Sequence, residues 1–476
     1  MNAPAQLAHL TPEIHPRDVP AALTAALQQR FGAQFSQTQA QREQHGRDES
    51  PFQVPPPAAV VFAESTQDVS DTIKLCAQHK VPVIPFGIGS SLEGQLLAVQ
   101  GGISLDVSRM NKVLAVHTED LTVTVQPGVT REQLNQELRD TGFFFPIDPG
   151  ANASLGGMAS TRASGTNAVR YGTMRENVLA LEVVTAQGEV VRTGTHAKKS
   201  SAGYDLTRLF VGSEGTLGVI TEVTLRIYPL PEAVMAAICS FPSMADAVNT
   251  VIQIIQAAVP IARVELLDDN TVRVVNKYSH LTLRESPLLL MEFNGSPASV
   301  KEQTEAVQEI AREHGGADFE WADKPEDRTR LWTARHKAYF AAVASRPGCR
   351  CVTTDTCVPI SHLADALLDT VDEANASQIP YFLVGHVGDG NFHMGYLIDP
   401  ASDSERAKAE DLNRTLVMRA LKLGGTCTGE HGIGLHKMDF LLEEAGGAVG
   451  LMRAIKKALD PDNIMNPGKI FHMDAP

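Results

Sequence analysis

Several features that define whole classes of protein are scarce or missing in this sequence. Its six cysteines form no C-x-x-C pair and no iron–sulfur ligand run, and a chain of 476 residues is too long for a disulfide-scaffolded mini-protein, so reduced thiols are expected. No apolar run reaches the roughly 18 residues of a membrane-spanning helix. The N-terminal segment MNAPAQLAHLTPEIHPRD lacks the basic start and apolar run of a secretory signal, so a cytoplasmic location is expected.

Positive charge is in the minority. The chain has 41 Lys and Arg against 56 Asp and Glu, which gives a formal net charge of −15. An acidic surface repels nucleic-acid phosphates and disfavours a nucleic-acid partner, although such surfaces are also common on soluble proteins. A site for an anion would therefore need its own local positive charge. The 43% hydrophobic content is typical of a globular enzyme of two or more domains, and neither repeats nor low-complexity tracts are present.

Two proline clusters, Pro55-Pro56-Pro57 and Pro229-Leu-Pro231, divide the chain. They predict a polar, helical N-terminal leader over 1–54, a first domain over 55–231, a second domain over 232–425 in which helices cover a sheet, and a C-terminal segment over 426–476. Hydrophobic periodicity predicts strands at 59–64, 81–85, 102–107, 113–117, 122–126, 217–228, 236–241, 262–268, 288–295, 350–360 and 381–386, a hairpin over 179–193, and helices at 68–80, 130–141, 244–258, 300–314, 326–344 and 360–376.

Three glycine- and serine-rich segments lie in the first domain. They are VPVIPFGIGSSLEG at 81–94, the long run PIDPGANASLGGMASTRASGTNAVRYG at 146–172, and GSEGTLGVI at 212–220. The first can present successive backbone N–H groups to an anion such as a pyrophosphate, and small side chains let the backbone approach a flat ligand. A tight turn explains the first segment nearly as well when it is taken alone. Together the three predict the lining of an extended cofactor.

These segments also carry a family resemblance. The motifs PFGIGSSLEG, PGANASLGGM, SAGYDLTRLFVGSEGTLGVITE and the terminal NPGK resemble the vanillyl-alcohol-oxidase flavoproteins, in the D-lactate dehydrogenase and glycolate oxidase D-subunit branch. The resemblance covers residues 55–472. It implies an α+β fold with a two-subdomain FAD-binding domain, an α+β substrate (cap) domain and a C-terminal helical segment that completes the active site. The pyrophosphate loop contains neither His nor Cys, so the FAD is expected to be non-covalent.

The resemblance implies which positions hold the cofactor. The pyrophosphate is expected at Pro85, Gly87, Gly89, Ser90, Ser91 and Leu92; the flavin at Pro149, Ser154, Gly156, Gly157, Ser160, Ser164, Gly165 and Tyr171; and the adenosine half near Glu214, Gly218 and Ile220.

Two further motifs point to a metal. GHVGDGNFH places His386 and His393 on either side of a Gly-Asp-Gly-Asn turn, and GGTCTGEHGIGLHK places Glu430 in a glycine-rich loop. Taken alone, the first motif is explained as well by a β-turn with incidental histidines. Two imidazoles and a carboxylate make a plausible divalent-metal set with open positions. The resemblance assigns all three residues as ligands, and zinc and manganese both suit them.

Two side chains are candidates for the chemistry. His431 has the ordinary pKa range of a general base near neutral pH, and it would remove the hydroxyl proton as hydride leaves for the flavin; a structural role is the alternative. Arg335, in LWTARHKA, can bind a carboxylate through two N–H groups, and the alternative is an ordinary surface arginine. Trp332, His336 and Tyr339 are weaker pocket candidates.

The expected reaction is oxidation of a small D-2-hydroxy acid to the 2-oxo acid. Related D-2-hydroxyglutarate enzymes carry a lysine near TDTCVP for a second carboxylate, whereas Thr353 occupies the nearest matching position here and Arg350 lies close. A monocarboxylate such as D-lactate is therefore the favoured substrate, and D-2-hydroxyglutarate or glycolate is the alternative. Electrons would pass to an external acceptor, which could be a cytochrome, a quinone or an electron-transfer protein. A homodimer is expected from the resemblance alone.

Three other interpretations remain open at this stage. An NAD-dependent enzyme would need an acidic ribose partner about 20 residues after the glycine loop, and Asp106 stands 17 residues after Gly89, but the third glycine of the fingerprint is missing. A non-catalytic subunit of a larger oxidase would not need the two histidines and Glu430. A direct oxidase that uses O₂ is the third, and the resemblance favours a dehydrogenase.

Overall fold

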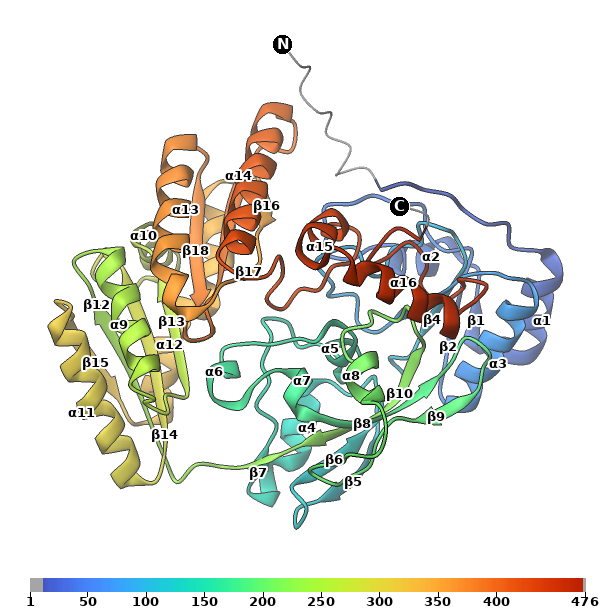
Figure 1. The fold of residues 1–476 in the computed structure, drawn as a ribbon, viewed down its shortest axis with the longest axis horizontal. Coiled ribbons are helices and arrows are strands. Elements are labelled where there is room, and N and C mark those ends of the chain that lie inside the picture. Colours follow the sequence, from blue (N-terminus) through green and yellow to red (C-terminus); the bar gives the residue numbers. More distant parts are fainter. Residues whose placement is uncertain (1–11, 474–476) are drawn as a thin grey trace. The chain divides into compact units, whose positions relative to one another are not determined.

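The protein is seen in a computed structural model that describes residues 12–473, so residues 1–11 of the N-terminal segment lie outside the description. The chain forms two compact units (Figure 1). Unit 1 consists of the described parts of Met1–Ser164 and Glu430–Pro476 together with Gly172–Pro229. Unit 2 consists of Gly165–Tyr171 and Leu230–Gly429. The mixture of helix and sheet agrees with the predicted α+β class.

The first sheet of unit 1 has the strand order β1-β2-β4-β3. Strands β2 (Ala59–Phe62), β3 (Val83–Phe86) and β4 (Ile103–Asp106) run parallel, as the predicted β-α-β start requires. Helix α3 (Thr66–Gln78) connects β2 to β3 and begins at Ser65, whose side chain accepts the Asp68 N–H. Its apolar face (Val69, Ile73 and Cys76) is buried with these strands in one hydrophobic core.

The second sheet of unit 1 is antiparallel, with the order β5-β6-β10-β8-β9. The predicted hairpin across Gln187-Gly188 is confirmed, because β8 pairs with β9 and Gly188 takes a φ of +74° that favours glycine. This sheet has its own hydrophobic core, so unit 1 contains the two subdomains that were expected. Its strands are β5 (Val113–His117), β6 (Thr122–Val125), β8 (Val178–Val184), β9 (Val190–Arg192) and β10 (Val219–Arg226).

The leader is less polar than its composition suggests. Helix α1 (Ala21–Phe31) buries Leu23, Leu27 and Phe31, and these side chains belong to the core of the first sheet. Strand β1 (Phe35–Ser36) pairs antiparallel with β2, and helix α2 (Gln39–Gln44) follows. The leader therefore supplies part of unit 1.

Short elements fill the rest of unit 1. They are α4 (Arg131–Leu138), α5 (Leu155–Thr161), α7 (Met174–Asn177), α8 (Leu206–Phe210), α15 (Met438–Ala445), α16 (Ala448–Leu459), the 3₁₀ helices η2 (Gly32–Gln34) and η3 (Arg139–Thr141), and the strand pair β7 (Phe143–Phe144) and β11 (Tyr228–Pro229). The terminal NPGK motif packs back into the first sheet, where the Asn466 N–H donates to the Val83 carbonyl.

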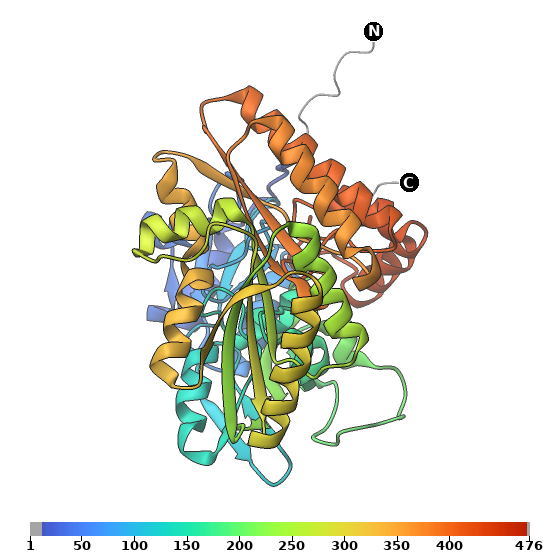
Figure 2. The same cartoon turned by 90° about the vertical axis from the view of Figure 1, so that its left-hand side faces the viewer.

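Unit 2 is built on one antiparallel sheet with the order β15-β12-β14-β13-β18-β19-β16, and β17 pairs with β19 (Figure 2). Side chains of β12 (Ala233–Ser240) alternate between two hydrophobic cores, because Ala237 and Cys239 lie in one core and Ala236 and Ile238 in the other. The remaining strands are β13 (Arg263–Leu267), β14 (Leu288–Gly295), β15 (Ala317–Ala322), β16 (Arg350–Thr353), β17 (Thr356–Cys357), β18 (Tyr381–His386) and β19 (Asn391–Ile398).

Helices cover both faces of this sheet. Helices α9 (Met244–Gln256), α11 (Pro297–Glu313), α13 (Leu363–Ser377) and α14 (Asp403–Lys422) contribute to one core. Helices α10 (Asp269–Ser279) and α12 (Pro325–Ser345) contribute to the other. The sheet is thus a buried middle layer. The short helices α6 (Ala168–Tyr171), η4 (Ile360–His362) and η5 (Val387–Asp389) complete the unit.

Four details of unit 2 differ from the sequence-based expectations. Helix α10 and the strands β15 and β19 were not predicted. Helix α10 is rich in β-branched residues, which weakens its sequence signal, but Asp268 caps it by accepting the Thr271 N–H. The strand predicted over 350–360 is divided into β16 and β17 by Thr354 and Asp355, whose side chains bond to neighbouring segments.

Gly156 lets α5 lie close to Pro127, in the loop before α4, and its substitution gives a first prediction. A Cβ added at Gly156 would lie 2.5 Å from Pro127 Cβ and 3.0 Å from Pro127 Cα. Because the proline ring cannot rotate away, Gly156→Ala is expected to reduce the free energy of unfolding by about 1–3 kcal/mol and to reduce bound flavin. Denaturant titration and the ratio of flavin to protein absorbance measure both effects. The control is Gly450→Ala, where no described atom lies within 4 Å of the added Cβ; an equal loss in both variants contradicts the prediction.

Candidate active site

The three glycine-rich segments of unit 1 meet. A Cβ added at Gly215 would lie 2.8 Å from Pro85 Cγ, and one added at Gly87 would lie 2.6 Å from Ser154 Oγ. Backbone hydrogen bonds tie the second segment to the third, because Glu214 N–H donates to the Ser160 carbonyl at 2.9 Å. Segments more than 120 residues apart in sequence therefore form one surface with little room for side chains.

This surface suits an extended cofactor with a diphosphate and a flat ring. Gly89 has a φ of +80°, the conformation that lets a loop turn its N–H groups toward an anion. Pro85, Gly87, Ser90, Ser91, Pro149 and Ser160 are partly exposed, and Leu92 is exposed, so these predicted positions are accessible to a ligand. Gly218 and Ile220 lie instead in packed surroundings, where Gly218 faces Val183 and Ile220 pairs with it in the sheet. Gly165 and Tyr171 belong to unit 2, and the Tyr171 hydroxyl accepts from Asn294 Nδ2 at 3.2 Å.

The Glu214 carboxylate binds the backbone of the loop that follows His431. Its two carboxylate oxygens accept the N–H groups of Ile433 and Gly434 at 2.7 and 2.8 Å. Burial raises the pKa of Glu214 to about 7, although the two amides and Lys469 oppose the shift. Glu214 thus fixes the loop that follows His431. An adenosine contact for Glu214 remains a prediction.

His431 is held by a carboxylate that sequence reasoning missed. Glu93 is 2% exposed, and its oxygens lie 3.2 Å from His431 Nδ1, 2.8 Å from His436 Nδ1 and 3.0 Å from Lys437 Nζ. Burial would raise the pKa of Glu93, but Lys437 and the two histidines outweigh it and leave that pKa well below its usual range. Because Nδ1 of His431 faces Glu93, Nε2 is the nitrogen of this ring that would accept a proton.

In unit 2, His386 and His393 stand on neighbouring strands of one hairpin. The predicted turn is confirmed, and Gly390 is required in it because an added Cβ would lie 2.1 Å from the Val358 carbonyl oxygen. The two imidazole rings have centroids 5.4 Å apart and are nearly perpendicular. His386 Nδ1 lies 2.6 Å from Glu265 Oε1, and His393 Nδ1 lies 3.0 Å from the Thr354 carbonyl oxygen. In both rings Nδ1 faces an acceptor, so Nε2 is the nitrogen that would bind a metal, which is how metal-binding histidines are usually held.

Arg335 is joined to the same buried acid. Its Nε donates to Glu265 Oε2 at 2.7 Å, and Glu265 is 0% exposed. Burial would raise the pKa of Glu265, but His386 and Arg335 outweigh it and leave the pKa below its ordinary value. Arg335 is therefore a cation fixed beside the histidine pair rather than a mobile surface arginine.

Glu430 follows a loop anchored next to His393. Gly429 N–H and Thr428 Oγ1 donate to Asp355 Oδ2 at 3.0 and 2.7 Å, and Asp355 Oδ1 lies 3.7 Å from His393 Nδ1. Glu430 is the next residue in the chain and the first of the last segment of unit 1. Its role as a ligand remains a prediction.

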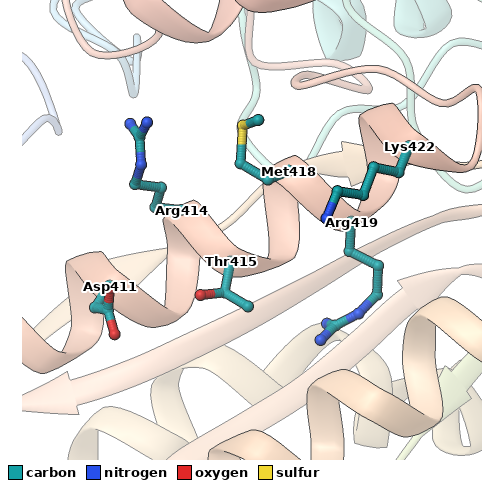
Figure 3. Close-up of a pocket in the computed structure, with 6 residues that line it drawn as sticks. All are labelled: Asp411, Arg414, Thr415, Met418, Arg419 and Lys422. Carbon is teal, nitrogen blue, oxygen red and sulfur yellow. The ribbon is translucent and has the colours of Figure 1, made fainter.

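The weaker pocket candidates lie on α12 in different surroundings. Trp332 is buried and stacks on His336 with ring centroids 6.2 Å apart. Tyr339 is 48% exposed. A hollow of about 450 Å³ follows α14 (Figure 3), and it contains none of the predicted site residues. Its lining is Asp411, Arg414, Thr415, Met418, Arg419 and Lys422, and Arg419 is already paired with Asp369.

Glu93 and Glu265 are the functional residues that sequence reasoning overlooked. Both left a signal: Glu93 is the one acid in SSLEG, and Glu265 is the one acid of strand β13, RVELL, with apolar residues on either side. An acid in such a place is rarely buried unless it is paired. The pattern alone does not identify the residue with which each acid is paired.

Two family models match this chain, one on each side of the predicted domain boundary near Pro231. Residues 57–194 match the FAD binding domain model, and residues 230–470 match the model of the C-terminal domain of FAD linked oxidases. The probable mitochondrial D-lactate dehydrogenase of Danio rerio is 52% identical over 91% of this chain and 88% of that protein. The mitochondrial D-lactate dehydrogenase [cytochrome] of Arabidopsis thaliana is 47% identical over 90% and 76%. A glycolate oxidase subunit of Bacillus subtilis is 35% identical over 93% and 94%.

Solved structures share the fold. p-Cresol methylhydroxylase with substrate bound has a TM-score of 0.79 at 18% identity and covers 97% of this chain and 100% of that chain. The 4-ethylphenol oxidase from Gulosibacter chungangensis has a TM-score of 0.78 at 19% identity, with 96% and 98% covered. Together with the matches in sequence, these likenesses confirm the vanillyl-alcohol-oxidase type of fold. The chain belongs to the FAD-linked oxidase family and is an FAD-dependent oxidoreductase.

Proposed function

We propose that this protein oxidises a small D-2-hydroxy acid, best represented by D-lactate, to the corresponding 2-oxo acid. The observation that carries the proposal is the series Arg335–Glu265–His386, in which one buried acid holds a cation beside a histidine pair. A cation and a metal-binding pair are what a substrate with neighbouring carboxylate and hydroxyl groups requires. Relatives at 47% and 52% identity bear D-lactate dehydrogenase names, which supports the choice.

Arg335 is proposed to bind the substrate carboxylate. Glu265 engages its Nε, and the terminal N–H groups of a guanidinium can donate to both oxygens of a carboxylate. A fixed arginine loses less conformational entropy on binding than a mobile one. The arginine also supplies the local positive charge that an acidic protein needs in order to attract an anion.

His386, His393 and Glu430 are proposed to bind a divalent metal, zinc or manganese. The residues fit the group, because Nδ1 of each histidine is occupied by an acceptor and Nε2 is the ligand nitrogen. Asp355 anchors Gly429, the residue before Glu430, close to His393. When bound, such a metal would lower the pKa of a hydroxyl and polarise oxygen atoms.

His431 is proposed to remove the hydroxyl proton. Glu93 holds Nδ1, so Nε2 accepts the proton, and the nearby carboxylate stabilises the positive charge that then develops on the ring. FAD, when bound, supplies the acceptor for the α-hydrogen as hydride. The glycine-rich surface of unit 1 orients that cofactor and leaves no space for bulky side chains between its segments.

Glycolate oxidation is the second candidate. The Bacillus subtilis relative, at 35% identity, is named as a glycolate oxidase subunit, and glycolate differs from D-lactate by one methyl group. A pocket usually discriminates such a difference by only about 1–3 kcal/mol. D-2-Hydroxyglutarate is a further alternative, for which Arg350 on β16 is an exposed cation.

The remaining partners are also proposals. The names of two relatives include a cytochrome, which supports transfer of electrons to an external acceptor; a quinone or an electron-transfer protein is equally compatible. Among residues 12–473 no helix is long and apolar enough to cross a membrane. A cytoplasmic location and a homodimer are proposed without a structural observation, and several relatives are named as mitochondrial.

The flavin spectrum tests the reaction directly. The purified chain is expected to show flavin bands between about 300 and 550 nm that bleach anaerobically with D-lactate and persist with L-lactate, because the substrate groups bind one enantiomer with its α-hydrogen toward the flavin. The rates at which glycolate, D-2-hydroxybutyrate and D-2-hydroxyglutarate bleach the same bands then show which substrate the pocket prefers. Bands that persist with every D-2-hydroxy acid would rule out this substrate class while leaving the FAD domain intact.

Substitution of His431 tests the base. His431→Asn is expected to lower kcat about 10²–10⁴-fold, the usual contribution of a general base, without loss of FAD. Stopped-flow reduction of the flavin by D-lactate measures the step. His436→Asn is the matched control, because it also loses a bond to Glu93 but removes no base. Similar losses in the two variants would mean that His431 acts only through Glu93.

Removal of metal tests the ligand set. Dialysis against a chelator is expected to abolish activity while FAD stays bound, and zinc or manganese should restore it, because the proposed ligands do not belong to the glycine-rich surface. His386→Ala is expected to lose both metal and activity. His362→Ala serves as the control, since that side chain is 43% exposed and its close acidic neighbour is Asp365. Full activity of a chain shown to be free of metal would disprove this part of the proposal.

A further inference from the structure

We propose that Glu265 is a positioning residue that couples metal binding at His386 to carboxylate binding at Arg335, so that the metal and the substrate anion bind cooperatively. This inference rests on the proposed function. It adds a role for Glu265 and the cooperative binding of the two ligands, neither of which the proposed function includes. It is carried by the contacts of a single buried side chain in unit 2.

The two oxygens of Glu265 have different partners. Oε1 lies 2.6 Å from His386 Nδ1, and Oε2 lies 2.7 Å from Arg335 Nε. Both distances are those of charge-assisted hydrogen bonds. Neither oxygen can serve the other partner without breaking its own bond, so the carboxylate is a rigid bridge between imidazole and guanidinium.

The sheet fixes this bridge in place. Leu266 pairs with Gly385 and Leu267 pairs with Val384, and the same antiparallel register continued by one residue sets Glu265 opposite His386. Helix α12, which carries Arg335, packs against β18, the strand that ends at His386. The three side chains thus come from two strands of the sheet and from a helix that covers it, and the Glu265 side chain is 0% exposed.

The charge of Glu265 depends on both partners. A fully buried carboxylate is costly unless it is paired, and Glu265, which is 0% exposed, is paired with His386 and Arg335. If the side chain of His386 or Arg335 becomes mobile, part of the negative charge of Glu265 is no longer paired. Ordering one partner therefore favours order in the other through their shared acid.

This arrangement makes the two ligands cooperative. Glu265 keeps the proton of His386 on Nδ1 and directs Nε2 to the metal, and it also fixes the plane of the Arg335 guanidinium. The first ligand to bind, metal or carboxylate, holds its own partner of Glu265 in place, and through the shared acid the second ligand meets a partner that is already held. By linkage, each ligand must raise the affinity for the other by the same factor.

Glu265→Gln is the informative substitution. A carboxamide places an acceptor oxygen at only one of the two positions and a donor NH₂ at the other, so the contacts with His386 Nδ1 and Arg335 Nε cannot both be kept as they are. The side chain keeps its size, and the packing of β13 is preserved. Either the histidine or the arginine then faces a second donor and loses its fixed orientation.

The experiment uses the FAD-loaded full chain and measures binding rather than turnover. Zinc affinity is measured by competition with a chromophoric chelator, with and without saturating pyruvate, the 2-oxo acid that the oxidised flavin does not consume. Pyruvate affinity is measured from the perturbed flavin spectrum, with and without zinc. In the unmodified protein each ligand is expected to tighten the other by about 5–150-fold, the usual range of coupling between sites.

In Glu265→Gln, zinc is expected to bind about 10–100-fold more weakly, as for other residues that orient metal ligands. Pyruvate should also bind more weakly, and the coupling factor should fall below that of the unmodified protein. Glu292→Gln is the matched control: Glu292 lies on the neighbouring strand β14, 3.7 Å from Arg263, with its side chain 14% exposed. Both affinities and their coupling should be unchanged there.

A second variant keeps the test decisive if Glu265→Gln does not fold. Arg335→Gln removes the carboxylate-binding group but leaves Glu265 bound to His386, so it should still bind zinc while pyruvate no longer affects that binding. An unmodified protein that binds neither zinc nor manganese would overturn the proposed metal site and the inference with it. Zinc and pyruvate that bind the unmodified protein independently, or Glu265→Gln with undiminished coupling, would overturn the inference alone.

Discussion

The structure depends on acids that are buried in apolar surroundings and paired on both oxygens. Glu265 holds His386 and Arg335, Glu93 holds His431, and Glu214 holds the loop after His431. For Glu93 and Glu265, whose pKa values lie below the ordinary value, the buried charge is tolerated only while its partners stay where they are, because an unpaired buried charge costs several kcal/mol. The acids therefore fix the reactive groups more firmly than hydrophobic packing alone could.

The glycine-rich segments solve a different problem. They must approach one another and a large planar cofactor, and the distances from their glycines to Pro85, Pro127 and Ser154 leave no space for a Cβ. Small residues give close approach but little rigidity of their own. Rigidity comes from hydrogen bonds between the segments, such as the one from Glu214 N–H to Ser160, and from the terminal Asn466, whose Nδ2 donates to the carbonyls of Gln95 and Glu214.

Much of the fold followed from local patterns, and the failures have physical reasons. Alternating or continuous apolar runs predicted the bounds of β2, β4, β10 and β14 to within a few residues, because the pattern of apolar residues along a strand reflects which of its side chains are buried. Helix α10 was missed because Thr and Val weaken the helical signal of its sequence and its stability comes from packing against α12. His386 and His393 were predictable from the turn between them, whereas Glu93 and Glu265 were not assigned, because their partners are 338 and 121 residues away in the chain.

The course of the chain between Ser164 and Gly172 has a consequence for any attempt to exchange parts between relatives. Residues Gly165–Tyr171 leave unit 1, form α6 in unit 2 and return. Within unit 2, Asn167 accepts from Arg263 Nε at 2.7 Å and Asn294 donates to the Tyr171 hydroxyl. A chimera joined at Leu230 would pair a new catalytic module with a foreign α6. An exchange of unit 2 must therefore include residues 165–171 as well as the segment from Leu230 to Gly429.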